Sequence, residues 1–153
     1  MTCARLIESW SGIHDFSVYL DRLGSISIED AMRKLISRKQ HGVADYTYVP
    51  TVMAAPNLAR FARNTTPARL SRGFASASLV NTLFTRAEWG AVKVLPFKAH
   101  LAIDAATGVA ALAAPWVFGF SNDRRARNTF LAMGVTALVV TLLSQPEEMR
   151  SRS

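Results

Sequence analysis

The sequence contains almost no cysteine, and this scarcity excludes whole classes of protein. Cys3 is the only cysteine among 153 residues, so the chain has neither an intrachain disulfide nor a cysteine metal cage. A phosphate-binding glycine loop and a nucleophile elbow are also missing from the sequence. We therefore predict no catalytic residue, no cofactor, no assigned metal site and no enzyme activity.

Charged residues are scarce as well, and long stretches lack them. Only 19% of the residues are charged, whereas 50% are hydrophobic. Residues 101–120 contain one charge, Asp104, and residues 128–144 contain none. About 20 helical residues cover roughly 30 Å, the thickness of the hydrocarbon core of a bilayer. Because only a short arginine-rich turn separates the two stretches, they predict a transmembrane helical hairpin.

Acidic residues are outnumbered by basic ones, which gives a formal net charge of +7. The basic residues form short clusters beside the apolar stretches, as in loops that flank membrane spans, and no nucleic-acid-binding motif accompanies them. The predicted partner is therefore the lipid bilayer and not nucleic acid. The two predicted sides carry nine and seven basic residues, so the positive-inside rule does not fix the orientation. We expect both termini in the cytoplasm and a multi-pass location in a bacterial inner membrane.

The two halves of the chain share an internal repeat. A shift of 59 residues places His41 on His100 and Asp45 on Asp104. The shared pattern is H-x3-D-x10-P-x4-F, and its prolines are Pro56 and Pro115. The repeat predicts that residues 41–61 and 70–85 form an earlier, more degraded helical hairpin.

The residues before the repeats have a different pattern. Ser27 is a plausible helix N-cap, and the apolar side chains of Ile28, Met32, Leu35 and Ile36 fall on one face, opposite a basic face. This pattern predicts an amphipathic helix up to residue 40, lying on the lipid surface or docked on a partner.

Together these patterns predict an all-α fold: an integral membrane four-helix bundle of two tandem transmembrane hairpins with an N-terminal amphipathic helical extension. The expected parts are the extension (1–40), the first hairpin (41–85), an interfacial linker (86–97), the second hairpin (98–144) and a polar tail (145–153).

The second hairpin resembles the SPW-repeat family of small integral membrane proteins. The matching site is Ala114-Pro115-Trp116, in which alanine replaces the serine of the Ser-Pro-Trp motif, and the first repeat has Ala55-Pro56-Asn57 in its place. The resemblance covers about residues 41–144. It implies a multi-pass membrane protein, and it implies no reaction.

The candidate functional residues are the repeated polar pairs His41/Asp45 and His100/Asp104. Residues i and i+4 share a helix face, so each histidine can hydrogen-bond its aspartate, and the pairs are expected to face each other between the repeats. Three roles are open. The pairs can pin the hairpins together, form a proton or ion path, or use the histidines as metal or haem ligands.

Further residues are expected to act in packing. Gly108 lies on the face of the second polar pair, where small residues let helices approach closely. Pro56 and Pro115 are expected to kink or end their helices, and Trp116 to anchor at the interface.

Three classes of function follow. The first is a structural or accessory membrane protein that packs as a homo-oligomer or in a larger membrane complex. The second is a small transporter or proton-conducting unit that uses the His/Asp pairs. The third is a haem- or quinone-binding redox membrane protein.

Overall fold

The chain divides into two units, Met1–Met32 and Arg33–Ser153, and the computed structural model describes residues 35–149 of the second. These residues form four helices: α4 (Arg38–Leu58), α5 (Thr65–Phe84), α6 (Phe97–Val117) and α7 (Arg124–Leu143). Residues 35–149 contain no extended strand, only two isolated bridges. The predicted all-α fold is confirmed for this part of the chain, and most of the predicted extension lies outside it.

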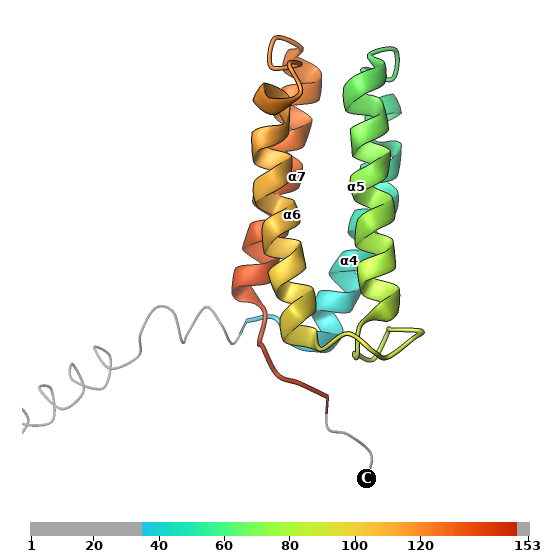
Figure 1. Cartoon of the computed structure of the whole chain (residues 1–153), viewed down its shortest axis with the longest axis vertical. Helices are drawn as coiled ribbons and strands as arrows, with labels where there is room; N and C mark the ends of the chain where they lie inside the picture. The colour runs from blue at the N-terminus through green and yellow to red at the C-terminus, as the bar shows by residue number, and fades with distance from the viewer. Residues whose placement is uncertain (1–34, 150–153) are drawn as a thin grey trace, which may run out of the picture. The chain divides into compact units, whose positions relative to one another are not determined.

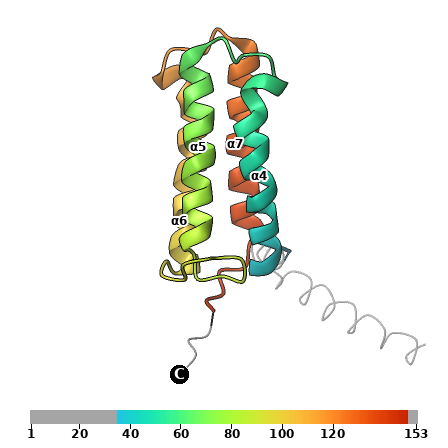
Figure 2. The same ribbon diagram turned by 90° about the vertical axis from the view of Figure 1, so that its right-hand side faces the viewer.

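The four helices form two antiparallel hairpins that stand side by side (Figures 1 and 2). α4 packs closely along α5, and α6 along α7, with sparser contact between the hairpins. The turns 59–64 and 118–123 lie at one end of the bundle, here called the loop end. The connection 85–96 and residues 35–37 and 144–149 lie at the other, the linker end. The first turns of α4 and α6 therefore meet at the linker end.

The start of α4 corrects one predicted boundary. Ser37 caps the helix: its Oγ accepts a hydrogen bond from the Gln40 N–H (3.3 Å), and Gln40 Oε1 accepts one from the Ser37 N–H (2.9 Å). Ile36 lies outside the helix and forms a bridge with Ser144. The amphipathic helix predicted up to residue 40 is therefore wrong at its C-terminal end, because the chain is not helical at 35–37.

α5 also begins earlier than predicted, at Thr65 instead of residue 70. Pro67 lies in its first turn, where a missing N–H breaks no helical hydrogen bond. Arg69, which precedes the predicted start, is therefore helical.

α4 and α6 end in the same way. Pro56 and Pro115 lie in the last turn of each helix, and each proline carbonyl accepts a hydrogen bond of 2.9 Å from a phenylalanine N–H five residues later. The intervening turn needs a left-handed residue, which is Arg60 (φ 60°) in the first hairpin and Gly119 (φ 71°) in the second. The two prolines thus mark helix ends rather than kinks.

The interior near the loop end is apolar. Phe120 and Phe130 meet there with ring centroids 5.0 Å apart. The buried cluster draws on all four helices and both turns: Val52, Phe61, Ala75, Ala114, Phe120, Ala126, Phe130 and Met133. It holds the hairpins together at the loop end, whereas polar contacts join them at the linker end.

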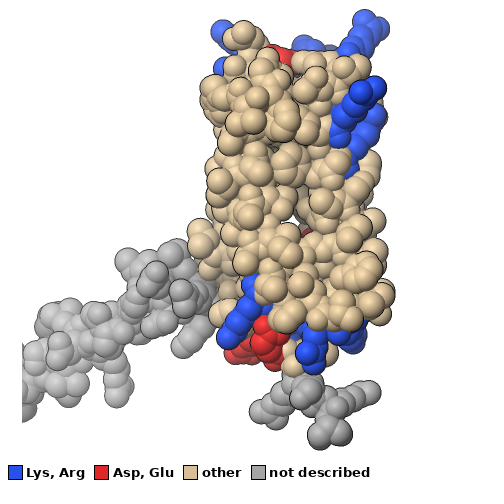
Figure 3. Space-filling view, in the orientation of Figure 1, with Lys and Arg blue, Asp and Glu red and all other residues tan. Residues whose placement is uncertain are grey.

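Two of the described helices, α6 and α7, are long and apolar enough to cross a membrane. Only 33% of the apolar window of α6 and 22% of that of α7 is buried, so most of the residues in these windows are at least partly exposed on the bundle. Figure 3 shows Lys and Arg toward the two ends of one face, with a broad uncharged band between them. These features support membrane association.

A buried histidine–aspartate site between the hairpins

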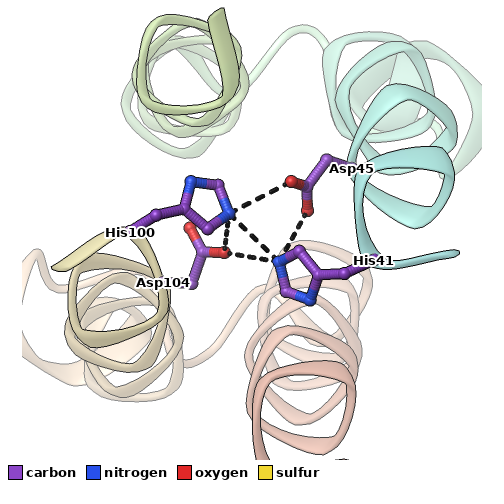
Figure 4. A group of neighbouring side chains, drawn as sticks. All are labelled: His41, Asp45, His100 and Asp104. Carbon is purple, nitrogen blue, oxygen red and sulfur yellow. Dashed lines mark hydrogen bonds and ion pairs between the residues drawn. The ribbon is translucent and has the colours of Figure 1, made fainter. Parts of the chain in front are cut away.

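His41, Asp45, His100 and Asp104, here called the quartet, come together at the linker end. His41 and His100 are each the fourth residue of their helix, and each aspartate follows one turn later on the same face. Figure 4 shows the two imidazoles facing each other with the carboxylates beside them. The structure thus brings together all four polar residues singled out from the sequence.

The ligand-type atoms of the quartet lie close to one another. The two histidine Nε2 atoms are 3.0 Å apart. Asp104 Oδ2 lies 2.9 Å from His100 Nε2 and 3.2 Å from His41 Nε2. Asp45 Oδ2 lies 3.2 Å from His100 Nε2, and its Oδ1 lies 3.5 Å from His41 Nε2. Each histidine therefore contacts both carboxylates, one from its own hairpin and one from the other.

The quartet is shielded from solvent. Both histidine side chains are 1% exposed, and both aspartate side chains are 15% exposed. Phe97 lies against both imidazoles, edge-on to His41 and stacked on His100. Removing charged groups from water in this way is costly unless they are paired, which the mutual contacts achieve.

A hydroxyl group from the opposite hairpin holds the outer nitrogen of each imidazole. His41 Nδ1 lies 2.7 Å from Ser144 Oγ, and His100 Nδ1 lies 2.8 Å from Thr85 Oγ1. These two contacts, like the quartet itself, recur at the interval of 59 residues. Neither hydroxyl residue is among those predicted from the sequence, although the same shift aligns Thr85 with Ser144.

The two sides of the quartet differ. On the side of α5 and α6, Asn81 Nδ2 donates a hydrogen bond of 2.9 Å to Asp104 Oδ1. Thr82 Oγ1 lies 3.2 Å from Asp45 Oδ2 and 2.9 Å from the Ser78 carbonyl oxygen, which share its one hydrogen. Their counterparts 59 residues later, Val140 and Thr141, line a cavity instead. Asn81 was also missed, and because it has no polar counterpart the repeat could not have indicated it.

The cavity has a volume of about 390 Å³ and extends from the quartet along α4 and α7. His41, Asp45 and Asp104 line it, together with six threonines. Thr141 Oγ1 is buried and has no hydrogen-bond partner among the described residues. The quartet therefore adjoins a partly open, largely apolar pocket with several threonines on one side and is filled on the other.

Three of the four residues expected to act in packing are buried, and the fourth is exposed. Gly108 faces Gly134 of α7, where an added Cβ would come within 3.2 Å of the Gly134 carbonyl oxygen. It therefore packs within its own hairpin and not between the hairpins. Pro56 and Pro115 are buried, and Trp116 is 59% exposed.

The arrangement does not suit haem. Two axial histidines on one iron would place their Nε2 atoms about 4 Å apart, twice a typical metal–nitrogen bond. Here they are 3.0 Å apart, and the carboxylates face the space between them. A single metal ion fits better, because each of the four residues offers one ligand atom and all four atoms lie within 4.8 Å of one another.

No family model, curated protein or solved structure matches the chain. The resemblance to SPW-repeat proteins therefore stays a prediction that depends on the short motif at Pro115 and Trp116.

Proposed function

We propose that the protein is a multi-pass integral membrane protein of structural or accessory type, with two tandem transmembrane hairpins of the SPW-repeat kind. The observation that carries the proposal is the exposure of the apolar windows of α6 and α7, of which only 33% and 22% is buried in the bundle. A soluble bundle would bury such side chains, whereas lipid accepts them. The proposal includes a place in a homo-oligomer or a larger complex of a bacterial inner membrane.

The contacts between the hairpins support the structural role. His41 bonds to Ser144 of the second hairpin, and His100 bonds to Thr85 of the first. In a bilayer, polar groups at a helix interface are satisfied by partners on neighbouring helices. The quartet therefore acts as a polar joint between two otherwise loosely packed hairpins.

Single-cysteine labelling in intact membrane vesicles tests this topology. In a Cys3→Ser background, cysteines are placed at exposed positions of the three connections: Ala62→Cys, Val92→Cys and Asn122→Cys. A membrane-impermeant maleimide should label positions 62 and 122 from one side and position 92 only from the other. Position 62 tests whether the first hairpin spans the membrane, because α4 and α5 are not among the two helices that are apolar enough to cross it by composition alone.

Two further positions test whether the exposed helix surface faces lipid or water. The side chains of Val109 and Val135 are more than half exposed in the bundle. Lipid around them would prevent labelling of cysteines there until the membrane is dissolved and the protein denatured. Labelling of all five positions from one side, or release of the protein by a carbonate wash, would refute the membrane topology.

One observation favours a second function, a proton- or ion-conducting unit: the cavity that begins at Asp45 and Asp104 and continues along threonines. Ionisable residues inside a membrane bundle often mark such a path. This function predicts a pH-dependent ion flux in liposomes that Asp104→Asn abolishes and Asp123→Asn, in the distant turn, leaves unchanged. Equal flux with and without protein would exclude it.

A further inference from the structure

The hydrogen bonds around the quartet fix where the histidine protons lie. Thr85 Oγ1 donates its only hydrogen to the Asn81 carbonyl at 2.6 Å, and Ser144 Oγ donates to the Val140 carbonyl at 2.6 Å. A hydroxyl has one hydrogen, so toward the imidazoles both oxygens act as acceptors. The protons therefore sit on the Nδ1 atoms, and neutral imidazoles direct Nε2 lone pairs into the quartet.

This tautomer leaves four acceptors facing one another. Two Nε2 lone pairs, 3.0 Å apart, meet carboxylate oxygens at 2.9–3.5 Å. Such a group is repulsive unless positive charge lies within it. Either extra protons convert the imidazoles to cations, or a metal ion accepts all four lone pairs. A histidine whose Nδ1–H is held by an outer oxygen while Nε2 points inward is the usual arrangement of a metal ligand.

The distances favour the metal. A tetrahedron with metal–ligand bonds of about 2.0–2.1 Å has edges of about 3.3 Å. The separations that involve the histidine Nε2 atoms, 2.9–3.5 Å, lie near that edge length, and all four ligand atoms lie within 4.8 Å of one another. A proton shared between the two Nε2 atoms would supply only one positive charge against two carboxylates, and two imidazolium ions would place two positive N–H groups 3.0 Å apart beside the carboxylate oxygens.

The charges agree with a dication. The two carboxylates carry two negative charges, and in the described part of the chain no Lys or Arg forms an ion pair with either. One divalent ion makes the buried site neutral, which a low-dielectric interior requires. Imidazole with carboxylate ligands suits zinc and its neighbours in the first transition series.

We propose that His41, Asp45, His100 and Asp104 bind one divalent transition-metal ion of the zinc class, which links the two hairpins. The cavity, which reaches three of these residues, provides the access route. Thr85 and Ser144 are positioning residues that orient the imidazoles through Nδ1.

Cobalt binding by the purified full chain tests the proposal. Protein is solubilised in mild detergent, stripped with a chelator and titrated with Co²⁺. We expect one Co²⁺ per chain, the intense visible absorption of a tetrahedral cobalt site, and its loss on addition of Zn²⁺. Metal analysis of unstripped protein should give about one equivalent. A stripped wild-type protein that keeps its helical spectrum and shows no absorption overturns the proposal.

Matched variants locate the site. Asp104→Asn keeps the shape but loses a ligand charge, and it should abolish the absorption. Asp123→Asn is the control, because residue 123 caps α7 at the far end of the bundle and the equivalent position of the first hairpin is already asparagine, Asn64. Equal cobalt binding by both variants overturns the proposal.

The positioning residues give a second readout that does not depend on removing a ligand. Thr85→Ala and Ser144→Ala each remove one Nδ1 contact, and loss of such a contact typically weakens metal affinity 10–100-fold. We expect that loss in affinity with unchanged stoichiometry at saturating Co²⁺. Unchanged affinity in both variants would overturn the tautomer argument. None of these results bears on the labelling pattern that tests the membrane topology.

Discussion

The tight contact between α6 and α7 at Gly134 allows a sharp prediction for Gly134→Ala. An added Cβ at Gly134 would lie 2.6 Å from Leu112 Cγ and 2.7 Å from the Gly108 carbonyl oxygen. Both separations are far shorter than a carbon contact, and the second involves backbone that moves only with the whole of α6. The substitution therefore forces the two helices apart.

The expected change in the free energy of unfolding can be estimated by comparing three glycines. Overpacking a tight interface costs about 1–3 kcal/mol, and the higher helix propensity of alanine returns about 0.5–1 kcal/mol, so Gly134→Ala should lose about 1–2 kcal/mol. Gly108→Ala should lose less, because its Cβ would meet looser contacts, Leu138 Cγ at 3.0 Å and the Gly134 carbonyl oxygen at 3.2 Å. Gly73→Ala meets nothing within 4 Å and should gain about 0.5–1 kcal/mol.

Thermal unfolding of the four proteins in one detergent, followed by helical circular dichroism, measures this series. The expected order of midpoints is Gly73→Ala, wild type, Gly108→Ala and lowest Gly134→Ala. A midpoint for Gly134→Ala equal to that for Gly73→Ala would refute the close packing of α6 on α7 at this point.

Three other predictions concern the ends of the helices. Left-handed backbone costs a residue with a Cβ about 1–2 kcal/mol, so Arg60→Gly (φ 60°) should raise the free energy of unfolding by about 1 kcal/mol and Gly119→Ala (φ 71°) should lower it similarly, as chemical denaturation would show. Hydrogen bonds from the Arg38 guanidinium hold the pKa of Glu88 below its ordinary 4.5. The stability that this pair contributes is present above pH 4.5 and is lost as the pH falls through the lower pKa of the folded state. Glu88→Gln should therefore flatten the acid limb of a stability–pH curve, by less than about 1 kcal/mol because the pair is partly exposed. Asp123→Ala removes the cap that accepts two N–H groups of α7 and should cost about 1 kcal/mol, measured by the same denaturation.

Helical periodicity and the repeat made the quartet predictable. A histidine and an aspartate four residues apart share a face whatever the packing, so the pairs at His41 and His100 needed only two adjacent helices to meet. The sequence also marks the turns well, since Pro56 and Pro115 lie at equivalent helix ends.

The rest depended on packing that one sequence does not encode locally. Thr85 and Ser144 follow the last residues of α5 and α7, where a hydroxyl serves equally well as a helix end or a turn residue. Asn81 contacts Asp104 across two helices without a repeat partner. The start of α4 at Ser37 was hidden because apolar residues precede it on an apparently continuous helical face.

The internal repeat also explains why the quartet has two histidines and two aspartates, and why it opens on one side. Two pairs of equivalent residues contact each other directly: His41 with His100 at the linker end, and Asn64 with Asp123 at the loop end. A residue touches its own equivalent only near the axis that relates two repeats, so this axis runs along the bundle from one pair to the other. Side chains beside such an axis come in identical pairs, and a single repeated H-x3-D pattern therefore yields two nitrogen and two oxygen ligands around one point. The residues around the quartet differ between the two repeats. With Asn81 on one side and valine at the equivalent position on the other, one flank is filled and the other opens into the cavity, so the wider opening to the quartet lies between α4 and α7.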